Sequence, residues 1–439
     1  MVKPSVIILS FFLFISLNCN NPTQPPVIQN VELKVNDATA TEVFLEITTS
    51  NINLPVSATL NKDGTLLQNI TLVNANTTIV DKSLSPNKNY TYQVIINING
   101  KQVTSSSVPA QTMDTTSHNF TWQTFTFGGL AGSSTLYDVA IINENDIWAV
   151  GEIYMNDSKG QPDPNAYNAV HWDGSKWELK RIKTNACGGV VYPPIKAIFV
   201  FSSNDILFAH IDGSISYYNE IEFINDCSLI TQLNGSANKI WGMSRNDFYV
   251  VSSNGFIAHY INGYWQKLIS GTNLNVNDIW GDFNQATGKY EILAVASNIF
   301  STPDRAILSI DPATRIVTHL SSQPIQYTLK GVWFNSNKQY FVSGDGIFQK
   351  HRLSDNSWKN NPLEITNYFI NKIRGNDIND VVAVGAFGEV LHYNGVNWKS
   401  YRNTTKINDG AYYSVETGNN LVAAVGQDNP AAVLIIGKR

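Results

Sequence analysis

The sequence contains few of the residues from which catalytic, metal and nucleic-acid sites are usually built. It has three cysteines in 439 residues, and charged side chains make up 15% of it, against about 25% in an average soluble protein. The net charge is −5, and no basic stripe runs along the chain. Because a phosphate backbone is bound by clustered basic residues, the composition excludes nucleic acid as an expected partner.

Sequence motifs of catalysis are also absent. There is no Gly-x-Ser-x-Gly, no His-Glu-x-x-His and no Walker-type loop. Neither Cys187 nor Cys227 has a second Cys or a His at the spacing of a zinc site. We therefore expect no cofactor and no metal site. In an oxidising compartment we expect these two cysteines to form a disulfide.

The N-terminal residues predict export. A mostly apolar run from Val6 to Leu17 is shorter than the roughly 20 residues that a membrane-spanning helix needs. The run ends in Ser-Leu-Asn-Cys, which resembles a bacterial lipoprotein signal and implies a signal peptide over residues 1–18 and lipidation of Cys19. Such signals usually have Gly, Ala or Ser where this chain has Asn18, so ordinary secretion is the alternative. We expect an envelope protein that is anchored to the outer membrane only by lipid, or that is periplasmic or at the cell surface.

The first domain is expected over residues 27–113, after a Pro-containing tether over residues 19–26. Short segments of alternating polarity, separated by turn sequences such as Asn-Lys-Asp-Gly, predict a β-sandwich. The sequence Leu-Ser-Pro followed by Tyr90 resembles the fibronectin type III family, in which one Tyr hydroxyl bonds back to the preceding turn. The resemblance implies this role for Tyr90. It also implies that Phe44 replaces the Trp of an early strand.

The remainder of the chain is a repeat. The segments His171–Trp177, His259–Trp265 and His392–Trp398 align without gaps, and each has a turn-forming Asn or Asp and a Gly between its ends. Each follows an apolar strand, and seven such strands begin near residues 146, 205, 247, 290, 338, 380 and 420. After the first interval, which holds an insertion, the spacing is about 40 to 48 residues, the length of one four-stranded propeller blade. The sequence therefore predicts an all-β protein with a seven-bladed β-propeller over residues 119–439, after a linker at 114–118.

The ends of the repeat predict that the ring closes on itself. The seventh repeat stops after three strands, and its missing fourth strand should carry a Trp. A strand with Trp122 precedes the first repeat, so we expect it to complete the last blade and remove the open edges. The pattern resembles seven-bladed propellers of bacterial envelope proteins, including those similar to photosystem II assembly factors, and more distantly the Asp-box propellers of sialidases. In this chain Asp173 and Gly174 are adjacent, whereas an Asp-box has one residue between them, so sialidase chemistry is not implied.

Candidate site residues are those that the repeat does not require. Because His171, His259 and His392 occupy equivalent positions around a ring, we expect them to be structural. Arg374 and Glu416 stand where other blades have Trp on the channel-lining first strand, which predicts either an ion pair or a polar contact for a ligand. The insertion Glu152–Tyr167 and the connection Asn185–Pro194 predict a binding face formed by loops. The candidate ligand-binding residues are Glu152, Tyr154, Asp157, Asp163, Tyr192, Asp212, Asp345, Arg374, Glu416 and Asp428.

These features favour a non-catalytic, monomeric binding module for a protein or a glycan. A glycan-cleaving propeller enzyme and a purely architectural protein are the alternatives. Three acidic side chains converging in a deep pocket would favour the enzyme, and a broad, shallow aromatic face would favour binding.

Overall fold

The computed structural model describes residues 28–185, 190–218, 223–226, 228–229, 236–298, 304–360 and 365–439. Cys19, Cys187 and Cys227 lie outside the described residues. Two compact units make up the chain, one including Phe44–Val80 and Tyr90–Ala110 and the other including Gln111–Arg439. Within the described residues, no helix is long and apolar enough to cross a membrane.

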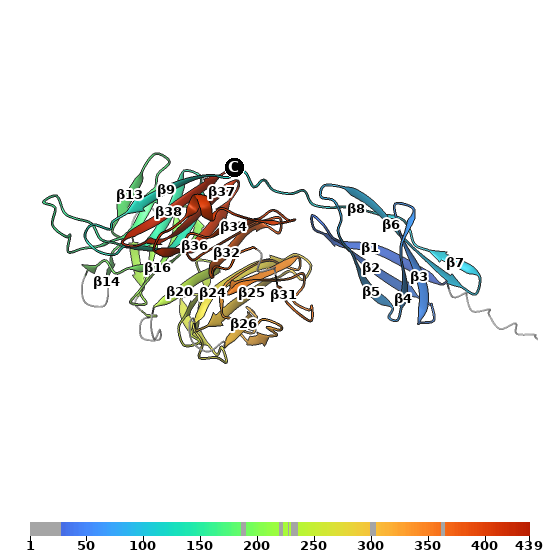
Figure 1. Ribbon diagram of the computed structural model, residues 1–439. Helices are drawn as coiled ribbons and strands as arrows, with labels where there is room; N and C mark the ends of the chain where they lie inside the picture. The colour runs from blue at the N-terminus through green and yellow to red at the C-terminus, as the bar shows by residue number, and fades with distance from the viewer. Residues whose placement is uncertain are drawn as a thin grey trace, which may run out of the picture. The chain divides into compact units, whose positions relative to one another are not determined.

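The first unit consists of two antiparallel sheets (Figure 1). One sheet has the order β1 (Asn30–Ala38), β2 (Val43–Ser50), β5 (Asn76–Asp81). The other has the order β4 (Thr65–Leu72), β3 (Val56–Lys62), β6 (Asn89–Ile98), β7 (Lys101–Thr104), and β8 (Val108–Gln111) also pairs with β6. Alternate residues of β6, including Tyr90 and Tyr92, are buried, as is Phe44 on β2. The two-sheet arrangement is the expected one, and the fibronectin type III assignment stays a prediction.

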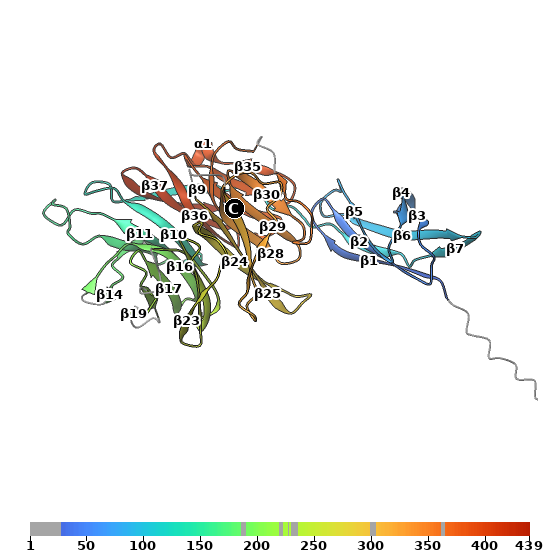
Figure 2. The same ribbon diagram turned by 90° about the horizontal axis from the view of Figure 1, so that it is seen from below.

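The second unit contains, in the described residues, seven four-stranded sheets that follow one another along the chain (Figures 1 and 2). In sheet order their strands are β10 (Thr135–Asn143), β11 (Asp146–Ile153), β12 (Tyr167–Trp172), β13 (Trp177–Lys180); β16 (Ile195–Ser202), β17 (Asp205–His210), β18 (Ile215–Tyr218), β19 (Phe223–Asp226); β20 (Ala237–Ser244), β21 (Asp247–Ser252), β22 (Ile257–Ile261), β23 (Tyr264–Leu268); β24 (Val276–Asn284), β25 (Lys289–Ser297), β26 (Arg305–Ile310), β27 (Val317–Leu320); β28 (Leu329–Asn335), β29 (Gln339–Gly344), β30 (Gly346–Lys350), β31 (Lys359–Asn360); β32 (Ile370–Asp377), β33 (Asp380–Gly385), β34 (Val390–Tyr393), β35 (Trp398–Ser400); and β36 (Gly410–Gly418), β37 (Leu421–Asp428), β38 (Ala431–Lys438), β9 (Thr121–Phe127). A short hairpin of β14 (Thr184–Asn185) with β15 (Val190–Val191) and a helix α1 (Arg402–Thr405) lie in connections between sheets.

The seven sheets form a closed ring. The first strand of each sheet contacts the first strand of the next sheet. In the seventh sheet this strand is β36, which contacts β10 of the first sheet. The last sheet is completed by β9, which pairs antiparallel with β38 so that Trp122 lies opposite Gly437. The pairing follows the expectation from the sequence, and it joins the start of this unit to the end of the chain.

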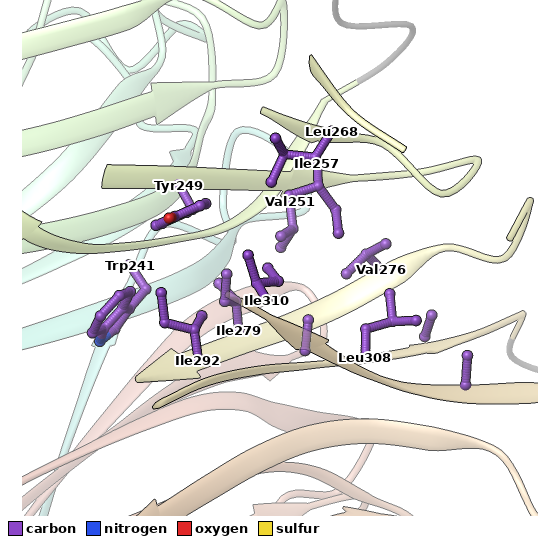
Figure 3. Close-up of a cluster of buried hydrophobic side chains, with 13 residues drawn as sticks. Trp241, Tyr249, Val251, Ile257, Leu268, Val276, Ile279, Ile292, Leu308 and Ile310 are labelled. Atoms are coloured by element: carbon purple, nitrogen blue, oxygen red, sulfur yellow. The ribbon is translucent and has the colours of Figure 1, made fainter. Parts of the chain in front are cut away.

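Apolar side chains fill the spaces between neighbouring sheets. Figure 3 shows one such cluster, in which Tyr249, Val251 and Ile257 of one sheet face Ile279, Ile292 and Leu308 of the next. The indole of Trp241 lies at the inner end of this cluster and covers the backbone of Gly281 in the next sheet, where an added Cβ would approach it to 2.4 Å. Trp333 covers Gly375 in the same way.

The repeated histidines have structural partners. In three sheets Nε2 of the His on the third strand lies within hydrogen-bond distance of an Asp that begins the second strand: His171 with Asp146 at 2.9 Å, His259 with Asp247 at 2.7 Å, and His392 with Asp380 at 2.9 Å. Each pair joins the second and third strands of a single sheet. The three histidines therefore do not converge on a common ligand.

Candidate functional site

A β-bulge occurs at the same place in the first strand of all seven sheets. The register of each first strand shifts by one residue near its start, which leaves one extra residue unpaired. Bulges re-aim side chains and are common next to functional sites. The seven extra residues are Tyr137, Lys196, Asn238, Asn277, Lys330, Asn371 and Tyr413, and all of them line one cavity of about 160 Å³ at the mouth of the central channel. We call this space the mouth cavity.

The asparagines of this ring fasten neighbouring sheets together. The Nδ2 group of Asn238 donates to the carbonyl of Val276 at 2.8 Å, and Nδ2 of Asn371 donates to the carbonyl of Tyr412 at 2.9 Å. In both cases the acceptor is the residue just before the bulge of the next sheet. Asn277 repeats the pattern with Leu329 at 2.9 Å. The ring geometry therefore depends on these side chains, which hold the rim of the cavity in place.

Two half-buried lysines supply the positive charge of the rim. The Nζ atom of Lys196 lies 3.2 Å from the centroid of the Tyr137 ring, and Nζ of Lys330 lies 3.3 Å from Oδ1 of Asn277. Burial lowers the pKa of Lys196 below its usual value, and Glu152 partly offsets this. Burial also lowers the pKa of Lys330, where Asp278 opposes the effect and Lys196 adds to it. Both lysines therefore sit where a positive charge is incompletely stabilised.

Glu152 connects the long insertion to the rim. Its carboxylate accepts a hydrogen bond from the hydroxyl of Tyr137, and its Oε2 accepts another from the hydroxyl of Tyr154 at 3.1 Å. Burial, with the adjacent Glu152, raises the pKa of both tyrosine hydroxyls, so they remain donors at neutral pH. Two of the residues expected from the sequence, Glu152 and Tyr154, thus lie beside the mouth cavity.

A buried ionic network forms the floor of the mouth cavity. Nζ of Lys239 lies 2.6 Å from Oδ2 of Asp138, and Nζ of Lys372 lies 3.0 Å from Oδ1 of Asp278. Arg374 binds both oxygens of Asp278, at 2.8 and 2.9 Å. Burial opposes ionisation of Asp278, but Arg374 and Lys372 outweigh it and hold the pKa of this carboxyl well below its usual range. Burial lowers the pKa of Lys372 to about 8, with Asp278 opposing the shift.

On the other side of this network from the mouth cavity lies a second cavity of about 240 Å³. It is lined by the part of the first strands that follows the bulges. Trp241, Trp280, Arg374 and Glu416 contribute to its wall. Burial raises the pKa of Glu416, and Arg374 partly offsets this. The sequence predicted that Arg374 and Glu416 would face the channel as an ion pair or a ligand contact. Both line this cavity, but the ion pair of Arg374 is with Asp278, a partner that the sequence did not indicate because it lies 96 residues away.

The other predicted acidic residues shape turns instead of gathering at one point. Oδ1 of Asp157 accepts from the backbone N–H groups of Lys159 and Gln161, Asp163 binds Arg181, and Asp212 caps the turn at Ser214. Oδ1 of Asp428 accepts from two backbone N–H groups of the preceding connection, at Asn408 and Asp409. Asp345 is exposed in a turn, and Tyr192 is half-buried beside β15. In the part of the chain that the structure describes, no three His, Cys, Asp or Glu side chains form a group suited to a metal ion.

The seven bulged residues of the rim were not predicted. The sequence does contain a signal for them. In the aligned first strands, the residue three positions before the Trp is polar: Asn238 before Trp241, Asn277 before Trp280, and Lys330 before Trp333. This column is polar or Tyr in all seven repeats, although it lies inside an otherwise apolar strand. Since a bulge shifts side-chain alternation by one residue, the column cannot be assigned to the channel from alternation alone.

Comparison with solved structures identifies the architecture. One solved structure described as YCF48 bound to D1 peptide is 14% identical, with a TM-score of 0.54 over 74% of this chain and 98% of that chain. YCF48 from Cyanidioschyzon merolae is also 14% identical, with a TM-score of 0.51 over 72% of this chain and 98% of that chain. The fold is that of a β-propeller. No family model and no curated protein matches the sequence, so this likeness concerns the fold alone.

Proposed function

We propose that this protein is a non-catalytic interaction module of the cell envelope, whose propeller binds a protein partner on the face that carries the mouth cavity. The observation that carries the proposal is the ring of seven bulged residues, because all seven sheets direct a polar or aromatic side chain into one cavity. A rigid scaffold that positions side chains from several elements at one opening is a common form of binding site. A related fold described as bound to a peptide supports a protein partner.

Exposed apolar side chains on the same face fit this function. Tyr327 lies in the connection before β28 and is 50% exposed, and Phe387 lies in the loop between β33 and β34 and is 47% exposed. Because first strands begin at the mouth and the sheets are antiparallel, both positions belong to the mouth face. Phe387 has a positive φ of 54°, a conformation that disfavours bulky residues and that most other such positions of the ring give to Asn or Gly. Such strain is often found where a side chain contacts a ligand.

The wider assignment is part of the same proposal. Each four-stranded sheet is one blade, so the propeller of residues 119–439 has seven. Residues 27–113 form a fibronectin type III-like spacer, and Cys19 carries the lipid that holds the protein at the outer membrane. Cys187 and Cys227 form a disulfide, which mass spectrometry of the exported protein would show as the loss of two free thiols.

A glycan-cleaving enzyme is less well supported by the cavities. Glycoside hydrolysis ordinarily uses two carboxyl groups that flank the scissile bond. Among the described residues, Glu416 is the one carboxylate in the lining of the second cavity. In the mouth cavity the one lining carboxylate, Asp138, is bonded to Lys239.

Site-specific photocrosslinking in producing cells tests the proposed face. A photoreactive residue is placed at Tyr327 or Phe387 on the mouth face, and at Tyr264 as the matched control, because Tyr264 begins a fourth strand on the opposite face and is 78% exposed. We expect a discrete crosslinked protein from the two mouth positions and none from Tyr264. Crosslinks confined to Tyr264 would show that the partner binds the other face.

A further inference from the structure

The mouth cavity holds two ammonium groups that lack a carboxylate partner in the described part of the chain. Lys330 bonds only to the amide oxygen of Asn277, and Lys196 contacts the face of the Tyr137 ring. The described ion pairs of the channel, by contrast, use Lys239, Lys372 and Arg374. Half-buried cations are usually paired, so these two are placed for a partner that the chain itself does not supply.

The floor beneath them does not neutralise this charge. It contains three cations, Lys239, Lys372 and Arg374, and two carboxylates, Asp138 and Asp278. Both carboxylates are already engaged, since Asp138 also accepts from Ser414 Oγ at 2.6 Å and Asp278 from the backbone N–H of Val332 at 3.0 Å. Glu152 lies near Lys196, and Glu416 lies near Arg374, so the five cations of rim and floor face four carboxylates. One positive charge remains without a counterpart among them, which favours a bound anion.

The dimensions of the cavity suit a small anionic group. Its volume is about 160 Å³, and it is partly open to solvent. The ionic floor separates it from the second cavity, so a chain cannot thread through the channel at this point. A chain end or one side chain fits the space. The ring of Tyr413 on the rim offers apolar surface to the peptide bond next to a bound carboxylate.

We propose that the mouth cavity binds one carboxylate group of a peptide partner, from its chain end or an acidic side chain, between the ammonium groups of Lys196 and Lys330. The inference rests on the proposed function and gives its ligand a chemical class. Binding would form charge-assisted hydrogen bonds from both ammonium groups to the carboxylate oxygens. The lowered pKa of both lysines would return toward the usual value once the anion is bound, because an opposite charge favours the protonated form.

Lysine acylation by trace acetic anhydride, followed residue by residue with mass spectrometry, tests the site in the full-length protein. The probes are N-acetylalanine for a chain end, N-acetylglutamate α-methylamide for a side chain, and N-acetylalaninamide as the neutral control. At four times its dissociation constant, a carboxylate probe should slow the acylation of Lys196 and Lys330 about five-fold. Exposed Lys406, in the connection after α1, should keep its rate. The neutral amide should protect neither lysine.

Variants separate binding from folding. Lys330→Met should abolish protection of Lys196, Lys330→Arg should keep most of it, and Lys406→Met should leave it unchanged. Because burial disfavours the charge of Lys330, we expect the melting temperature of Lys330→Met to be no lower than that of the wild type. An unchanged melting temperature would show that the loss of protection does not come from unfolding.

Three results would overturn the proposal: equal protection by the neutral amide, no protection by either peptide acid, or stronger protection by inorganic phosphate or glucuronate than by both peptide acids. Crosslinking from Tyr327 and Phe387 would then still report on the protein partner independently. Retained crosslinks with no protection would reject the carboxylate alone, and crosslinks only from the opposite face would reject the proposed function.

Discussion

Nζ of Lys239 lies 2.6 Å from Oδ2 of Asp138, although the two residues are 101 positions apart and their first strands, β20 and β10, are separated by another sheet. Lys372 and Asp278 repeat the relationship between β32 and β24, across β28. Both pairs span the channel by skipping one sheet of the ring. They therefore link sheets that share no hydrogen-bonded edge, and they divide the channel into two cavities.

Breaking the Lys239–Asp138 pair should strongly destabilise the propeller. Lys239→Met leaves the buried carboxylate of Asp138 without its nearest cation, and we expect the free energy of unfolding to fall by about 3–5 kcal/mol. Adding Asp138→Asn removes the unpaired charge and should restore part of the loss. Urea denaturation measures both, with Lys289→Met on an exposed residue as the control. A double variant that is less stable than Lys239→Met would contradict this account of the pair.

The Trp–Gly contacts between sheets predict a second effect on stability. A Cβ at Gly281 would lie 2.4 Å from the indole of Trp241, and one at Gly375 would lie 2.8 Å from Trp333. Gly281→Ala and Gly375→Ala should each cost about 1–3 kcal/mol, because the indoles are packed and must move. Gly418→Ala is the matched control on the first strand of the last sheet, where the nearest atom to an added Cβ is 3.4 Å away. Equal melting temperatures for all three variants would show that the indoles relocate freely.

The sequence predicted the repeat, the strand order and the closing strand, because each rests on local patterns that recur at a fixed spacing. The turn between His171 and Trp177 identifies the third and fourth strands wherever it occurs, and Trp122 marks an otherwise missing fourth strand. The channel could not be derived in the same way. Its floor depends on which sheets face each other across the axis, as the sheets of Lys239 and Asp138 do. Its rim depends on β-bulges that the sequence of a single repeat does not predict.

The acidic candidates Asp157 and Asp212 also have a structural role that the sequence did not separate from binding. Asp157 and Asp212 stood out because they lie in loops of the expected binding face. In turns, however, a carboxylate commonly accepts backbone N–H groups two residues further on, and both residues do so. Loop acidity alone therefore did not distinguish a ligand contact from a turn residue.

The closing strand yields a third prediction. Deleting residues 119–126 removes most of β9 and exposes the edge of β38, so the melting temperature of the propeller should fall sharply. A matched control moves the same residues behind Arg439 through a short turn, where they can pair again with β38. We expect this rearranged chain to recover most of the melting temperature. Unchanged stability after the simple deletion would show that β9 does not close the ring.

Acid should weaken the contact between the chain end and the sixth sheet. Asp380 accepts from Asn376, pairs with Arg439 and lies 2.9 Å from Nε2 of His392. Burial opposes ionisation, but the hydrogen bonds from His392 and Arg439 outweigh it and lower the pKa of Asp380 from 3.8 to about 2. Because the folded pKa is the lower one, the stabilisation is complete above about pH 4 and is lost as the pH falls toward 2.

The lowering of the pKa of Asp380 from 3.8 to about 2 corresponds to about 2.5 kcal/mol of stability at neutral pH. Asp380→Asn should therefore be less stable than the wild type by about that amount at pH 6, and the difference should narrow between pH 4 and pH 2. Urea denaturation at several pH values measures it, and Asp345→Asn, on an exposed residue, should follow the wild-type curve throughout. The pairing of Asp380 with the chain end would be disproved as a source of stability if the gap between Asp380→Asn and wild type stayed constant down to pH 2.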